Sequence, residues 1–102
     1  MPLFTVRMVG GPAWDASRAR RDQSGWAVHA AFMDRLVAIG AVVLGGPIGD
    51  GSQVLLVVDA ADEAAIHDSL DADPWVLAGV LRIGEIERWA VWLDGRQSRG
   101  PR

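Results

Sequence analysis

The segment from Val54 to Val58 is apolar at every position rather than at every second one. Successive side chains of a β-strand point to opposite faces, so a strand with this pattern needs apolar cover on both faces of its sheet. The chain has 102 residues, which suffices for one compact domain with a single core. The other elements of this domain must therefore supply the cover, or a partner must.

Strand and helix signals alternate along the chain. Strands are expected at 3–9, 41–44, 53–59 and 80–93, helices at 25–39 and 62–72, a short capped turn at 73–79, and a bulge near 84–85. Gly40 ends the first helix, residues 45–48 form the irregular end of the second strand, and residues 49–52 form a hairpin turn. The polar, arginine-rich loop at 11–24 is long enough to act as a lid.

This order predicts a ferredoxin-like βαββαβ sandwich of the α+β class, with a four-stranded antiparallel sheet and both helices on one face. We expect one domain at 1–94 and a flexible polar tail at 95–102. The second face of the strand at 54–58 stays uncovered, although burying one Val or Leu contributes about 1.5–3 kcal/mol. We therefore expect a homodimer that packs sheet to sheet about a two-fold axis.

Composition excludes several function classes. The chain has no cysteine and no lysine, which rules out thiol nucleophiles and Schiff bases. A net charge of -3 argues against nucleic acid, and the apolar runs are shorter than the roughly 18 residues of a membrane span. The first residues do not resemble a secretory signal, so a cytoplasmic location is the expectation. Arg18, Arg20 and Arg21 cluster, and we interpret them as a solvated loop in preference to an anion clamp.

His29 lies near the middle of the apolar face of the first helix, where a leucine would be usual. Asp73, directly before Pro74, offers a carboxylate with which it can pair. A carboxylate that accepts the N–H of one imidazole nitrogen fixes the tautomer and leaves the other nitrogen as a base. The alternative is a structural pair, in which His29 is a satisfied core histidine and Asp73 only a helix cap. The residues alone leave both interpretations open.

Several motifs carry a resemblance to a known family. They read Gly-Pro-x-Trp at 11–14, Gln-x-Gly-Trp-x-x-His-Ala-x-Phe-Met-x-x-Leu at 23–36, Gly at 40, Gly-Gly-Pro at 45–47 and Asp-Pro-Trp-x-x-x-Gly at 73–79. In this order the chain resembles the YCII-related (YciI-like) domain family, which is similar in fold to the dimeric α+β barrels. The resemblance implies that His29 and Asp73 face a pocket as an acid/base pair. It also implies elimination or isomerisation on small oxygenated organic molecules.

Further residues are candidates for binding a small-molecule ligand. Trp14, Trp26 and Trp75 either line an apolar pocket or belong to the core. Gly46 either lets a ligand approach the strand closely or marks a bulge. Arg7 alternates with the apolar residues of the first strand, which places it on the other sheet face with Thr5. There it binds either an anionic group of the ligand or an acidic partner across the dimer.

We expect no metal site, because His29 and His67 are far apart in the sequence and belong to no His/carboxylate motif with the spacing of metal ligands. The glycines match neither a phosphate-binding loop nor a dinucleotide fingerprint, so no cofactor is expected. The sequence thus predicts a cofactor-independent enzyme of the lyase or isomerase type. The alternative is a non-catalytic dimer that binds a small molecule and acts in regulation.

Overall fold

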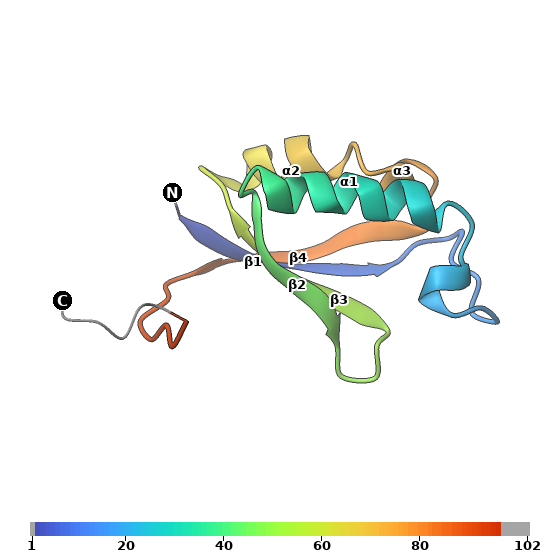
Figure 1. Cartoon of the computed structure of the whole chain (residues 1–102), viewed down its shortest axis with the longest axis horizontal. Helices are drawn as coiled ribbons and strands as arrows, with labels where there is room; N and C mark the ends of the chain where they lie inside the picture. Colours follow the sequence, from blue (N-terminus) through green and yellow to red (C-terminus); the bar gives the residue numbers. More distant parts are fainter. Residues whose placement is uncertain (1, 97–102) are drawn as a thin grey trace.

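A computed structural model describes residues 2–96 of the chain. Four strands, β1 (Leu3–Gly10), β2 (Val42–Ile48), β3 (Gln53–Asp59) and β4 (Leu81–Trp89), form an antiparallel sheet in the order β2-β3-β1-β4. The helices α1 (Trp26–Ala38), α2 (Glu63–Leu70) and α3 (Pro74–Leu77) lie on one face of this sheet in Figure 1 and leave its other face free of them. The short 3-10 helix η1 (Arg20–Asp22) lies beyond one end of the sheet. The predicted ferredoxin-like α+β fold with a four-stranded antiparallel sheet is confirmed.

The core lies between the sheet and the helices. In β1, Phe4, Val6 and Met8 alternate with less buried residues, so the strand turns one apolar row toward the helices. Ile66 and Leu70, one helical turn apart in α2, are fully buried against it. The core therefore lies on one face of the sheet, and the three helices do not cover the opposite face.

Local turn chemistry follows the sequence closely. The Asp62 carboxylate accepts the N–H of Ala65 at 2.9 Å and begins α2, and Gly40 ends α1 with φ 82°. In β4, residues 84 and 85 together lie opposite Arg7, because the register shifts between Val6 and Met8. The predicted bulge is thus confirmed at its predicted place.

Residues 45–48 were predicted as the irregular end of the second strand, but they pair with residues 53–56 of β3 in unbroken register, so β2 continues regularly to Ile48. β2 is an edge strand, and an edge strand tolerates proline because one side of its backbone needs no partner. A Cβ on Gly45 would lie 2.6 Å from Leu56 Cδ2. Glycine at this position therefore lets Leu56 pack against the strand.

Two other boundaries were also wrong. The last strand was predicted to reach residue 93 but ends at Trp89, which pairs with Leu3 at the start of β1, so no further β1 residue remains for it to pair with. The second helix ends at Leu70 rather than at 72, because the N–H of Asp73 bonds the carbonyl of Leu70 and starts the next turn. Of the tail predicted at 95–102, residues 97–102 lie outside the described residues.

Gly11 makes the closest backbone contact of any glycine in the described part of the chain. Its N–H bonds the carbonyl of Val80, and a Cβ added to it would lie 2.2 Å from the carbonyl oxygen of Gly79. We expect Gly11→Ala to lower the free energy of unfolding by about 1–3 kcal/mol, since the backbone must move to accept the methyl group. Chemical denaturation measures this.

The neighbouring glycine supplies a matched control. A Cβ on Gly10 lies 3.4 Å from the nearest atom of Trp14, so we expect Gly10→Ala to be tolerated. Equal stability of the two variants would contradict the close approach at Gly11.

Candidate active site

The first turns of α1 place His29 over the sheet. Gly25 precedes the helix with φ 80°, and its carbonyl accepts the N–H of His29 at 3.1 Å as the helix begins. His29 is 9% exposed, which agrees with its predicted place on the buried face of the helix. A histidine in such a position needs a polar partner, because burying an unpaired polar group is costly.

That partner is Asp73. His29 Nδ1 lies 2.9 Å from both carboxylate oxygens of Asp73, although the two residues are 44 positions apart in the chain. Asp73 is fully buried, and its Oδ1 also accepts the backbone N–H of Trp75 at 3.0 Å as the cap of α3. One carboxylate thus begins a helix and holds an imidazole.

The arrangement assigns separate roles to the two ring nitrogens. A carboxylate only accepts hydrogen bonds, so Nδ1 carries the proton that lies between His29 and Asp73. Nε2 makes no hydrogen bond to any residue in the range 2–96. In the neutral imidazole, Nε2 is therefore an unprotonated base that can accept a proton from another molecule.

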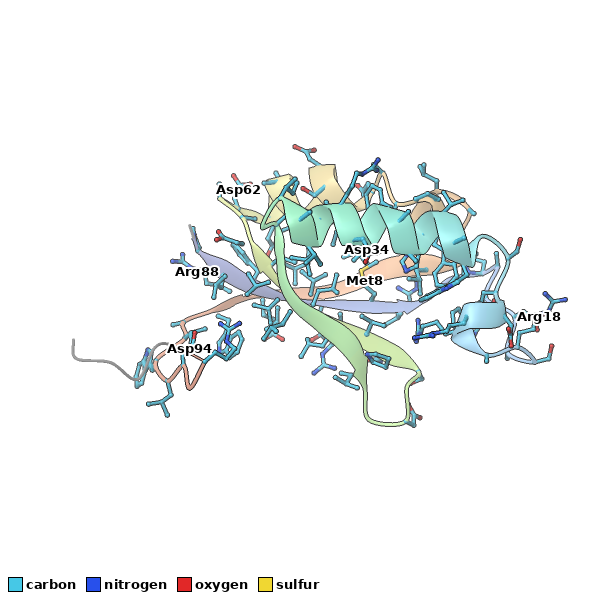
Figure 2. The ribbon with its side chains drawn as sticks, viewed as in Figure 1. Met8, Arg18, Asp34, Asp62, Arg88 and Asp94 are labelled. Carbon is cyan, nitrogen blue, oxygen red and sulfur yellow. The ribbon has the colours of Figure 1, made fainter. Side chains whose placement is uncertain are left out.

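A cavity of about 270 Å³ lies between α1 and the sheet, beside His29. Its lining is mostly apolar, and Figure 2 shows Met8 and Asp34, two of its lining residues, near the space under α1. Asp34, Val37 and Pro47 are exposed members of this lining, so the cavity opens between α1 and the edge strand β2. An apolar pocket with few polar groups is typical of a small-molecule site.

The three tryptophans, for which the sequence left pocket lining and core open, take different places. Trp26 lines the cavity, with its ring centroid 5.8 Å from that of His29. Trp75 does not line the cavity, since it is 1% exposed and stacks behind His29 with ring centroids 4.1 Å apart. Trp14 lies further back, edge-on to Trp75 at 6.3 Å.

Gly46 lines the cavity, and a Cβ there would meet no atom within 4 Å. Arg7 is not brought to the cavity. Its side chain is on the opposite sheet face, where Nη1 donates to Gln53 Oε1 at 3.3 Å. Arg7 can therefore reach only a ligand or partner on that face.

Arg20 is a cavity residue that the sequence analysis did not single out. It lines the cavity, its guanidinium lies 5.1 Å from the ring centroid of Trp14, and Nη2 donates to the carbonyl of Gly51 at 2.8 Å. Partial burial lowers the pKa of the Arg20 guanidinium, which stays a cation at neutral pH. Arg20 is thus partly buried at the cavity, whereas Arg18 is exposed and lies at the outer end of the loop in Figure 2.

The loop that carries Arg20 is held together by one buried amide. Gln23 is 4% exposed, its Nε2 donates to the carbonyls of Asp15 and Arg18, and its Oε1 accepts the N–H of Asp15. These bonds and the link from Arg20 to Gly51 fix the loop beside the mouth of the cavity.

The family model for the YCII-related domain matches residues 12–90, which include every element from α1 to β4. The chain belongs to the YCII-related domain family. The family predicted from the motifs is thereby confirmed. None of the curated proteins matches this member of the family.

A solved structure is similar to this YCII-related domain over most of both chains. It is the 5-chloro-2-hydroxyhydroquinone dehydrochlorinase (TftG) of Burkholderia phenoliruptrix AC1100 in complex with 2,5-dihydroxybenzoquinone. The TM-score is 0.64 at 26% sequence identity, and the match covers 86% of this chain and 93% of that one. The likeness supports the fold, and the relative binds a small hydroxylated quinone.

Two further findings concern the described residues alone. Among residues 2–96, no group of three or more His, Cys, Asp or Glu side chains is arranged to hold a metal ion. None of the helices in this range is long and apolar enough to cross a membrane.

Proposed function

We propose that this protein is a cofactor-independent enzyme of the lyase or isomerase type, with His29 as general base and acid. The observation that carries the proposal is the contact of His29 Nδ1 with the buried Asp73 carboxylate at 2.9 Å, beside an apolar cavity. The contact leaves Nε2 free to exchange a proton with a bound molecule. The activity of the similar dehydrochlorinase supports the same reaction class.

The reaction follows from the free nitrogen. Nε2 removes a proton from a hydroxyl group or from a carbon beside a carbonyl, and the electron pair of the broken bond moves into the substrate. In an elimination, that pair expels a leaving group with its own bonding electrons. In an isomerisation, the imidazolium returns the proton to another atom. Asp73 stabilises the imidazolium in both cases, because a negative charge lies against Nδ1.

The cavity indicates the size and polarity of the substrate. About 270 Å³ of mostly apolar space suits a single substituted ring rather than a polymer or a nucleotide. Arg20 offers one cation in the wall, which suits an ionised hydroxyl group. We therefore propose a small hydroxylated ring, such as a hydroquinone, as the substrate class.

We further propose a homodimer that buries the helix-free face of the sheet. This face carries a largely apolar surface around a hollow of about 470 Å³, lined by Thr5, Leu44, Gly45, Gly46, Pro47, Ile48, Leu55, Val57 and Trp89. A second copy offers the same surface by two-fold symmetry. Arg7 and Gln53 would lie in that contact, which favours a role for Arg7 at the dimer interface rather than in the cavity.

A panel of substituted hydroquinones, with and without ring chlorine, tests the function. We expect wild type to release chloride or to change the ultraviolet spectrum of at least one compound, and His29→Ala to abolish the reaction. His67→Ala is the matched control, since His67 also contacts an aspartate but is an exposed residue of α2. Binding that persists in His29→Ala without turnover by wild type would instead support a non-catalytic ligand-binding dimer.

A further inference from the structure

Trp75 contacts both members of the acid/base pair. Its ring stacks on the imidazole of His29, with centroids 4.1 Å apart and planes inclined by 8°. Its backbone N–H donates to Asp73 Oδ1 at 3.0 Å. One residue therefore touches the imidazole on its face and the carboxylate through a hydrogen bond.

Trp75 is itself held from several sides. Its Nε1 donates to the carbonyl of Ser24 at 2.7 Å, and Trp14 packs edge-on against its ring. A Cβ on Gly25 would lie 3.3 Å from the same Nε1, so the chain passes close to the ring at the start of α1. The indole is 1% exposed and lies outside the cavity lining. The indole of Trp75 is therefore held rigidly against one face of the His29 imidazole, and it does not line the cavity in which a ligand would bind.

The imidazole needs a neighbour that restricts its rotation, because rotation about the Cβ–Cγ bond of histidine has a broad, roughly two-fold energy profile. A half-turn would exchange Nδ1 for a carbon atom opposite Asp73 and would move Nε2 relative to the cavity. A parallel ring in contact with one face of the imidazole restricts this rotation. The hydrogen bond from the Trp75 N–H restrains the carboxylate at the same time.

We propose that Trp75 is a positioning residue, which holds His29 and Asp73 in the geometry that keeps the proton on Nδ1 and directs Nε2 to the cavity. The proposal deepens the proposed acid/base function and rests on it for the kinetic part of its test. Of the two places that the sequence left open for Trp75, the pocket lining or the core, the structure shows the core. The effect of Trp75 on a reaction must therefore pass through His29.

Nuclear magnetic resonance tests the positioning without any substrate. In wild type, we expect the Cε1–H signal of His29 to lie upfield of that of His67, because the indole face shields a stacked proton. His67 is an internal reference, since it stacks on no aromatic ring within residues 2–96. Long-range nitrogen correlation at high pH should show the proton of His29 on Nδ1. A His29 signal at the position of His67 in wild type would overturn the proposal without a single variant.

Two substitutions of Trp75 distinguish the effect of its aromatic face from that of its Nε1 hydrogen bond to Ser24. Trp75→Phe keeps an aromatic face but loses the Nε1 bond to Ser24, so we expect it to retain most of the upfield shift and the Nδ1–H tautomer. Trp75→Leu removes the face, so the His29 signal should move toward that of His67 and the tautomer should become mixed. Ile66→Ala is the control for lost core packing, because Ile66 is fully buried in α2 and its apolar side chain makes no hydrogen bond or ion pair with either member of the pair.

Kinetics on a hydroquinone that the wild type converts gives the second arm. We expect Trp75→Leu to lower kcat about 10- to 100-fold with little change in KM, as for a small misplacement of a catalytic group. Trp75→Phe should restore most of kcat, and Ile66→Ala should leave it unchanged. A rise in KM at constant kcat would make Trp75 a ligand contact and overturn the proposal.

The two proposals fail in different ways. If wild type converts no compound, or if His29→Ala retains turnover, the proposed enzyme function fails, while the resonance arm still decides the role of Trp75. If Trp75→Leu loses as much thermal stability as Ile66→Ala but keeps the wild-type shift, tautomer and kcat, Trp75 is only a core residue. The positioning role is then wrong even though the enzyme function stands.

Discussion

Replacing Asp73 by asparagine is expected to lower kcat by about 10²–10⁴-fold while the protein stays folded. The substitution keeps the shape of the side chain and exchanges one carboxylate oxygen for an NH₂ group. Both oxygens lie 2.9 Å from His29 Nδ1, so the change is made in direct contact with the imidazole. Steady-state kinetics on the best substrate of the hydroquinone panel measures the effect.

The expected loss has two physical sources. The negative charge that stabilises the imidazolium disappears, and the new NH₂ group can donate to Nδ1, which shifts the proton of His29 to Nε2. A protonated Nε2 in the neutral ring can no longer accept a proton from the substrate. KM should change much less than kcat, because Asp73 acts on the substrate through His29.

Stability should survive because asparagine is as good a helix cap as aspartate. Its side-chain oxygen can still accept the N–H of Trp75, the bond that begins α3. Asp71→Asn is the matched control, since Asp71 Oδ1 lies 3.5 Å from His67 Nδ1 on the surface of the protein. A variant Asp73→Asn that is folded and fully active would show that the buried pair is structural and would refute the acid/base assignment.

Placing a charge on the helix-free face of the sheet is expected to dissociate the proposed homodimer. Leu44 lies on this face in the edge strand β2 and is 49% exposed, so a glutamate there is tolerated by the isolated subunit. In the dimer, two-fold symmetry buries the charge twice. We expect Leu44→Glu to convert the dimer to a monomer at micromolar concentration, which analytical ultracentrifugation measures.

The size of this effect follows from the burial of polar groups. Each buried, unpaired polar group costs at least about 1–3 kcal/mol, so two copies destabilise the dimer by about 2–6 kcal/mol. Since about 1.4 kcal/mol is a factor of ten in an equilibrium constant, the dissociation constant should rise roughly 30-fold to 10⁴-fold. The dissociated Leu44→Glu subunit should remain folded, because the substitution leaves the core between the helices and the sheet unchanged.

Val28→Glu is the matched control for this experiment. Val28 is 59% exposed on α1, on the side of the molecule away from the helix-free sheet face, so a glutamate there should not affect a sheet-to-sheet dimer. Wild type that sediments as a monomer, or dimers that dissociate equally in both variants, would contradict the proposed interface.

The local elements were predictable because their signals are local. The cap at Asp62, the proline turn after Asp73 and the glycine at the end of α1 each satisfy backbone groups within a few residues of themselves. The end of β4 was not predictable in this way, because Trp89 is the last residue with a partner in β1. A strand ends where its neighbour ends, and the neighbour is distant in sequence.

The residues of the candidate site were likewise predictable only in part. The contact between His29 and Asp73 was predicted, since a histidine on an apolar helix face needs a partner and the Asp-Pro turn supplies one. The cavity residue Arg20 was missed, because its sequence neighbours Arg18 and Arg21 carry the same charge and the pattern cannot distinguish them. Contact with Gly51, 31 positions away, distinguishes Arg20 from both.

By itself, the sequence determined the order of elements, the apolar strand that needs cover on both faces, and the residues with acid/base chemistry, because periodicity, turn residues and side-chain type are properties of short segments. Only the tertiary structure decided that Trp75 lies behind His29 and that Arg20 faces the cavity, whereas the alternation of β1 already placed Arg7 on the other face of the sheet. The positions of Trp75 and Arg20 depend on which side of a strand or helix meets a segment many residues away. Such meetings are decided by packing across the whole core.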